Sequence, residues 1–350
     1  MKFKFPLEVK EMKRFVSIKI ILLICLLGTL VFLIGCTPSV STHTGTVTGV
    51  INVYWPNAED FMPGAARIDV LDEGIFTVSS FSNGTYTLSN VPVGQHTITV
   101  FKHRYITAQQ VVNVVEGQTV TNVCFNLELE VPTDQLGGVY YFGFNLDMTP
   151  FNNLKVRQAI NYSIDKQTLI DEVNAEFSVS KVVAQGPIPP SMMSYISSLT
   201  GYSYDVAEAQ TLLSQAGYPE GFSTDLYYNI LDSGFHHFIA QKIQIYLAQI
   251  GIIAELHGMV WDELLNLINQ GELPFFRTGW IADTPDPADY LYSLYHSASS
   301  DNYTYYDNTT IDNLIEQAWM TIDVADFLQL IRQIESTIVD DAPAIYLYHY

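Results

Sequence analysis

Residues 274–295 read PFFRTGWIADTPDPADYLYSLY, and this stretch indicates the fold more clearly than any other. Residues 274–281 are apolar and aromatic enough to form a buried strand. Pro285 and Pro287 prevent the strand from continuing, because proline lacks the amide that a sheet needs. The pattern therefore predicts a switch from strand to helix, with Asp283 inside the switch. Open α/β sheets bind their ligands at the carboxyl ends of strands, which is where this switch lies.

Asp283 and Trp280 are the candidate ligand contacts of this stretch. A carboxylate partly withdrawn from water forms a charge-assisted hydrogen bond with an ammonium group, and a neighbouring indole offers an apolar wall. The alternative is structural: Asp283 or Asp286 caps the helix that opens at Pro287, since aspartate before a first-turn proline is a common helix start. From these residues alone, both interpretations stay open.

The chain from residue 138 to 350 alternates short apolar strands with helical patterns, which is typical of an α/β fold. Asp205 and Glu208 form a capping-box pattern that opens one helix, and Gly217 closes it. Strands are predicted at 139–146, 226–230, 252–256, 274–281 and 344–350, and helices at 153–174, 205–217, 235–250, 261–269, 311–322 and 324–339.

Residues 45–130 follow a different pattern, in which polar and apolar residues alternate between frequent turn residues. Asn83-Gly84 is a strong hairpin signal. The segment SNGTYTLSNVPVGQHTITV at 82–100 resembles the carboxypeptidase regulatory-like β-sandwich, which implies an all-β domain that acts as a spacer or interaction platform. Strands are predicted at 46–54, 67–71, 76–81, 85–88, 96–102, 107–115 and 119–129.

The N-terminus carries a secretory signal pattern. Basic residues up to position 19 precede an apolar run at 20–34, which is short for a membrane-spanning helix of about 20 residues. Leu33-Ile34-Gly35-Cys36 resembles the lipobox of bacterial lipoproteins, which implies a signal peptide at 1–35, lipidation of Cys36 and a tether at 36–44. We therefore expect an exported protein anchored to a bacterial membrane and facing the periplasm or the cell exterior. An uncleaved anchor helix is the alternative.

The charge and the cysteine content exclude several functions. The chain has 16 Lys and Arg against 37 Asp and Glu, for a formal charge of −21, and such an acidic surface repels nucleic acid. Three cysteines provide neither a disulfide framework nor a metal cluster. No catalytic or phosphate-binding motif of the common kinds is present. We therefore expect a protein that is not an enzyme and that has no cofactor and no bound metal.

Seven segments of 138–350 resemble, in order, the C-terminal half of the family 5 extracellular solute-binding proteins, the oligopeptide- and dipeptide-binding lipoproteins of ABC importers. The resemblance implies a lobe of the periplasmic-binding-protein type II class, preceded by a linker at 131–137. The segments are VYYFGFNLDMTPFNNLKVRQAINYSIDKQTLI, AQGPIPP, YDVAEAQTLLSQAGYPEGF, IAQKIQIYLAQIGIIAEL, FFRTGWIADTPDPADYLYSLY, NYTYYDNTTIDNLIEQA and IVDDAPAIYLYHY.

The same resemblance assigns roles to five residues. It implies that Asp283 binds the α-ammonium of a peptide, that Trp280 lines the pocket, and that Arg277 meets a carboxylate or pairs within the lobe. Asn302 and Tyr303 match a pattern on the cleft side of the family's fold. Permease subunits of an ABC importer are the implied protein partners.

The chain also departs from the family, whose members are roughly twice as long and close two lobes around the ligand. We expect a binding protein reduced to one lobe that holds peptides or other small solutes weakly, because an ion pair facing solvent is worth only about 0–1 kcal/mol. The alternative function is a remodelled, non-transporting surface lipoprotein that acts as an interaction or adhesion module.

Overall fold

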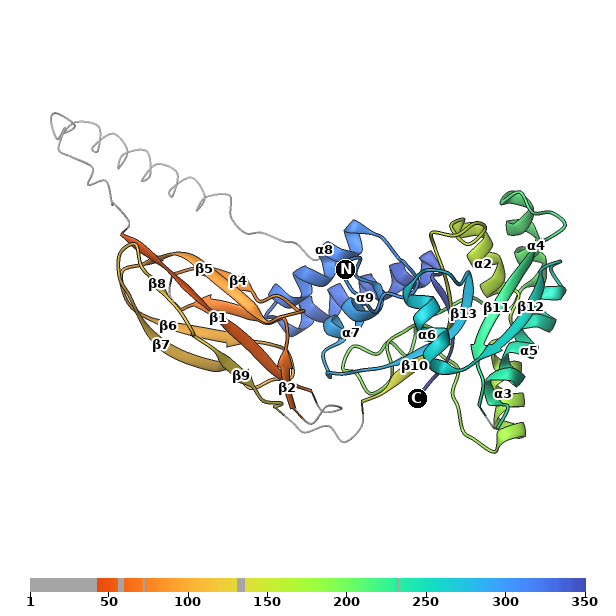
Figure 1. Ribbon diagram of the computed structural model, residues 1–350, viewed down its shortest axis with the longest axis horizontal. Coiled ribbons are helices and arrows are strands. Elements are labelled where there is room, and N and C mark those ends of the chain that lie inside the picture. Colours follow the sequence, from red (N-terminus) through yellow and green to blue (C-terminus); the bar gives the residue numbers. More distant parts are fainter. Residues whose placement is uncertain (1–42, 56–59, 72, 131–135, 232) are drawn as a thin grey trace, which may run out of the picture. The chain divides into compact units, whose positions relative to one another are not determined.

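The computed structural model of the protein describes residues 43–55, 60–71, 73–130, 136–231 and 233–350 (Figure 1). The predicted signal peptide, Cys36 and most of the predicted tether and linker lie outside these residues. Of the helices that the structure describes, none is both long and apolar enough to cross a membrane.

The first described part, here called the β-domain, comprises nine strands in two sheets that share one apolar core. In one sheet, β1 pairs with β2 and β5 antiparallel and with β8 and β9 parallel. The other sheet has the order β4-β3-β6-β7. The strands are β1 Thr44–Trp55, β2 Asp60–Pro63, β3 Arg67–Val70, β4 Ile75–Val78, β5 Thr85–Pro92, β6 Gly94–Phe101, β7 Ala108–Val114, β8 Thr119–Val120 and β9 Phe125–Leu127.

Two details of the β-domain correct the sequence prediction. Strand β2 has no counterpart among the seven predicted strands. The strand predicted at 119–129 is two short strands, because Asn122 takes a left-handed backbone conformation with φ of 60° between β8 and β9. That conformation interrupts an extended chain, and asparagine tolerates it better than most residues.

The second part, here called the lobe, is built on a sheet of order β12-β11-β13-β10-β14. Strand β10 runs antiparallel to its neighbours β13 and β14, while β11 runs parallel to β12 and β13. The carboxyl ends of β11, β12, β13 and β14 therefore lie along one edge. The strands are β10 Gly138–Phe144, β11 Ser223–Asn229, β12 Ile253–Met259, β13 Phe275–Ile281 and β14 Ala344–His349.

Helices cover both faces of this sheet (Figure 1). Alternate residues of β10 point to opposite faces, so that Tyr140 and Phe142 join one apolar cluster and Val139 and Tyr141 join the other. The first cluster packs under α2 Leu154–Tyr162, α3 Lys166–Phe177, α4 Val206–Gln215 and α5 Phe235–Ala248, and the second under α7 Pro287–Tyr295, α8 Thr309–Met320 and α9 Val324–Asp341. The remaining helix, α6 Trp261–Asn269, packs on Phe276 of β13. This arrangement confirms the α/β class predicted for the lobe.

The single helix predicted at 153–174 is in fact two helices, α2 and α3. The Asp165 carboxylate accepts a hydrogen bond from the Thr168 amide and so caps α3. Ser163, which is buried, donates its hydroxyl to the Ile160 carbonyl at the end of α2. Such local side-chain bonds to the backbone favour helix ends over helix interiors, and the apolar period of the segment does not reveal them.

The β-domain and the lobe are in direct contact, and residues 44–350 form one compact unit. Arg67 donates to the Met320 carbonyl at 2.6 Å, and His103 Nε2 lies 2.8 Å from the Thr321 carbonyl oxygen. Ala65 of the β-domain belongs to the apolar cluster under α7, α8 and α9. The β-domain therefore packs directly on the lobe.

Candidate functional site

The connection between β13 and α7 is fixed at both ends. On the strand side, the Ala282 amide donates to the Gly137 carbonyl. On the helix side, the Asp286 carboxylate accepts a hydrogen bond from the Ala288 amide at 2.9 Å, so Asp286 is the cap of α7. Asp283 plays no part in starting the helix, which removes the structural alternative for this residue.

Asp283 is a half-buried carboxylate without a counter-ion. It makes no hydrogen bond or ion pair with any residue that the structure describes. Burial raises its pKa to about 6, and the nearby Asp301 carboxylate adds to the effect. A carboxylate held away from water with no cation beside it is strained electrostatically, and a cationic ligand relieves that strain.

Asp301 lies near the Asp283 carboxylate, Tyr303 lies beside Asp301, and Trp280 contacts Tyr303. The rings of Trp280 and Tyr303 meet edge to face with their centroids 6.4 Å apart. Burial raises the pKa of Tyr303 to about 12, helped by the Asp301 carboxylate beside it. Burial likewise raises the pKa of Asp301, and its bond with Tyr303 opposes that shift. The structure therefore brings three of the predicted residues together with Asp301, which the sequence did not identify.

A cavity of about 610 Å³ adjoins this group. It presents three carboxylates and no Lys or Arg, which suits a cationic or hydroxyl-rich ligand. Asp283 and Trp280 are not among its lining residues, whereas Asn302 and Tyr303 are. The lining comprises Asp147, Ile268, Asn269, Ser297, Ser299, Ser300, Asp301, Asn302, Tyr303, Tyr305, Tyr306 and Asp307.

The side chain of Asn302 is occupied by its own loop. Its Oδ1 accepts from the Tyr306 amide and the Thr304 hydroxyl, both at 3.1 Å, and its Nδ2 donates to the Tyr306 carbonyl at 2.7 Å. Asn302 therefore holds the shape of the loop that presents Tyr303. Its ligand contact stays a prediction.

Arg277 lies on the other face of the sheet from Trp280, because the two residues are three positions apart on β13. Its guanidinium carbon lies 4.4 Å from the centre of the Tyr140 ring and 5.9 Å from that of Trp261. Nη1 donates to Asn229 Oδ1 at 2.9 Å. The sequence did not identify Trp261 or Asn229 as neighbours of Arg277, although each lies at the end of a predicted element.

The charge of Arg277 is not balanced. The side chain is 8% exposed, pairs with no acid among the described residues, and has a buried Nε without a hydrogen-bond partner. Burial, with a further contribution from Arg277, lowers the pKa of His236 to about 3, so this neighbour is neutral. A buried guanidinium with a free donor is a site for a carboxylate.

The comparisons with known proteins point to one family. The model of bacterial extracellular solute-binding proteins, family 5, matches residues 104–302. The dipeptide-binding protein of Escherichia coli is 30% identical over 227 residues, which are 63% of this chain and 41% of that protein. Heme-binding protein A of Haemophilus influenzae is 31% identical over 216 residues, or 60% of this chain and 39% of that protein.

A solved structure agrees with these sequence relatives. HbpA2 from Haemophilus parasuis superimposes with a TM-score of 0.57 at 26% identity, covering 61% of this chain and 43% of that one. The chain spans about two fifths of the length of the curated relatives it matches. Because the family model covers more than half of the sequence, the protein belongs to the bacterial extracellular solute-binding proteins of family 5.

Proposed function

We propose that the protein binds a short peptide, or another small solute with an ammonium and a carboxylate group, at the carboxyl edge of the lobe's sheet. One observation carries the proposal: β13 and its extension present two uncompensated charges of opposite sign, Arg277 and Asp283. Relatives named for dipeptide, heme and glutathione binding support a solute of this size.

The two ends of a peptide meet different surroundings in this proposal. Asp283 accepts the ammonium, with Trp280 and Tyr303 forming an apolar wall. Arg277, which lies on the other face of β13 from Trp280, is the proposed partner of the carboxylate. Tetraalanine carries one free ammonium and one free carboxylate and is therefore a suitable probe.

We further propose that Cys36 carries a lipid anchor and that permease subunits of an ABC importer receive the solute. Membership of a family of extracellular solute-binding proteins supports an extracytoplasmic location. Asp283 is only half-buried, so water reaches an ion pair at this carboxylate and weakens it. We expect dissociation constants weaker than micromolar for free peptides.

Isothermal titration of the full chain with tetraalanine tests the proposal. Asp283→Asn removes the ammonium partner, and Asp171→Asn, which alters an exposed carboxylate on α3 that contacts Gln167, is the matched control. The expected result is that the wild type and the control bind alike and that Asp283→Asn binds about fivefold more weakly. Binding that is equal in all three proteins would remove Asp283 from the site, and a micromolar dissociation constant would contradict the weak binding expected here.

A further inference from the structure

The ammonium group of Lys102, which follows β6 of the β-domain, is buried against the start of α7 in the lobe. The side chain is 2% exposed. Its Nζ donates to Asp286 Oδ2 at 2.9 Å, to Asp289 Oδ1 at 2.8 Å and to the Ala65 carbonyl at 2.9 Å. These three bonds use all three protons of the ammonium group.

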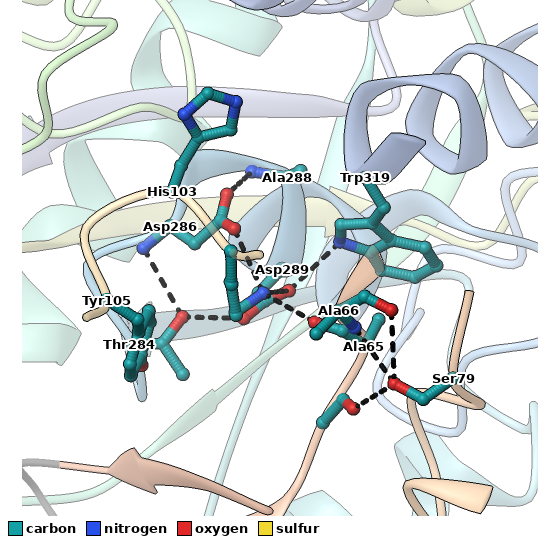
Figure 2. Close-up of polar contacts among 12 residues, drawn as sticks. Ala65, Ala66, Ser79, His103, Tyr105, Thr284, Asp286, Ala288, Asp289 and Trp319 are labelled. Atoms are coloured by element: carbon teal, nitrogen blue, oxygen red, sulfur yellow. Dashed lines mark hydrogen bonds and ion pairs between the residues drawn. The ribbon is translucent and has the colours of Figure 1, made fainter. Parts of the chain in front are cut away.

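The two carboxylates that receive Lys102 are themselves bound to the connection that carries Asp283 (Figure 2). Asp286 caps α7 through the Ala288 amide, and its own amide donates to Thr284 Oγ1 at 3.3 Å. Asp289 Oδ2 accepts from Thr284 Oγ1 at 2.9 Å. Trp319 of α8 donates to Asp289 Oδ1 at 3.0 Å.

The charges within this network stabilise each other. Burial alone disfavours the ammonium form, but the Asp286 and Asp289 carboxylates outweigh it and raise the pKa of Lys102. Removing the lysine leaves two buried carboxylates, at 2% and 4% exposure, without a cation. Removing one partner of a buried ion pair disrupts its surroundings far more than removing an exposed one.

We propose that Lys102 is a positioning residue for solute binding, through which the β-domain holds the connection 282–286 and so sets the place of Asp283. The proposal rests on the proposed function, because it concerns the same carboxylate. Asp283 precedes Thr284 directly, and the far end of the connection is tied by the Ala282 amide to Gly137. Lys102 also neutralises two of the three carboxylates in residues 282–289, which leaves Asp283 as the one that attracts a ligand cation.

Other contacts between the β-domain and the lobe provide a matched control. Arg67 reaches the carbonyl of Met320, the last residue of α8. Phe81 stacks on Trp319, with ring centroids 5.7 Å apart. None of the hydrogen bonds of Arg67 involves residues 282–289. Arg67→Met therefore loosens the same interface without cutting the tie to the connection.

Hydrogen–deuterium exchange on the full chain, without ligand, tests the positioning. Lys102→Met is expected to speed amide exchange in 282–289 at least tenfold more than in β10 to β14. Arg67→Met is expected to leave exchange in 282–289 as in the wild type. Unchanged exchange of 282–289 in Lys102→Met would overturn the proposal. Should that variant not fold, the charge-neutral triple variant Lys102→Met, Asp286→Asn, Asp289→Asn replaces it, with the same expected result and the same overturning one.

Titration with tetraalanine, well below the melting temperature of each variant, separates positioning from general stability. We expect Lys102→Met to lower the affinity about fivefold, as loss of the Asp283 contact itself would, and Arg67→Met to leave it unchanged. Equal loss of affinity in both variants would overturn the specific role of Lys102. If the wild type binds no tetraalanine but Lys102→Met exchanges faster in 282–289, the positioning stands and the proposed function fails.

Discussion

Asp283 and the pair Asp286 and Asp289 lie within seven residues of each other and differ in their partners, although burial raises the pKa of both Asp283 and Asp289 to about 6. Asp286 and Asp289 are fully buried, and each carboxylate is bonded to Lys102 and to groups of the lobe. Asp283 is half-buried, faces Asp301 instead of a cation, and has a pKa raised to about 6 by burial. The comparison shows that the spacing of acids does not reveal their role. The role is revealed by whether the protein itself places a cation beside the carboxylate.

The largest expected effect is on stability, and it comes from removing the Lys102 ammonium that pairs with Asp286 and Asp289. Lys102→Met leaves two buried carboxylates unpaired, which costs about 3–5 kcal/mol of unfolding free energy. Urea denaturation of the full chain measures it. Lys242→Met, which breaks a partly exposed ion pair with Glu172, is the control and should change stability by less than about 1 kcal/mol. Equal effects in the two variants would contradict the contrast between buried and exposed pairs.

The next effect concerns the charge of Arg277. Tetraalanine with an amidated C-terminus loses its carboxylate and with it a charge-assisted hydrogen bond to a buried donor, worth about 1.5–3 kcal/mol, or tenfold or more in affinity. Acetylation of the N-terminus removes the contact with the partly exposed Asp283, and the loss should be smaller, about 1 kcal/mol. Titration with the free, amidated and acetylated peptides shows which end of the peptide contributes more to the affinity. A larger loss of affinity from acetylation than from amidation would contradict the stronger contact assigned to Arg277.

A smaller effect is the pH dependence that Asp283 gives to stability. Because its folded pKa of about 6 exceeds the ordinary 3.8, folding loses stability as the pH rises between these values, and the full penalty applies above pH 6. Asp283→Asn removes the penalty. We expect the variant to be more stable than the wild type by about 1 kcal/mol at pH 7.5, allowing for solvent screening, and equally stable below pH 4. Denaturation curves of both proteins at pH 7.5 and below pH 4 measure this. The same stability difference between variant and wild type at both pH values would disprove the prediction.

The smallest expected effect is a change in the pKa of Asp283 when its neighbour Asp301 is replaced. Asp301→Asn removes the negative charge beside Asp283, so the pKa of Asp283 should fall. The fall should be partial, because burial is the larger cause and remains. An NMR titration of the Asp283 carboxyl in the variant measures it. A complete return to 3.8 would mean that burial contributes little.

Local signals in the sequence predicted much of the fold. The residues of α6 match the prediction, and β13 differs from it by one residue, because a strand between polar turns and a helix start marked by proline both leave clear signals. The split between α2 and α3 was missed, since the Asp165 cap competes with a helical apolar period.

The candidate site was predicted only in part, for a physical reason. Trp280 and Asp283 are close in sequence and in space, whereas Asp301 reaches them through a loop that has no periodic pattern. Lys102 lies 184 residues before Asp286, and no local pattern predicts that pair. The orientation of Arg277 follows from strand alternation. Its surroundings without an acid depend on residues that are distant in sequence, namely Tyr140, Asn229, Trp261 and Tyr350.

The most direct test of the central claim is an NMR titration of the Asp283 carboxyl in the full chain, with and without saturating tetraalanine. An uncompensated, half-buried carboxylate that receives a ligand ammonium should titrate at about 6 alone and at a lower pH with the peptide, because a nearby cation favours the charged form. A pKa near 3.8 without ligand, or one that does not move on binding, would contradict the claim.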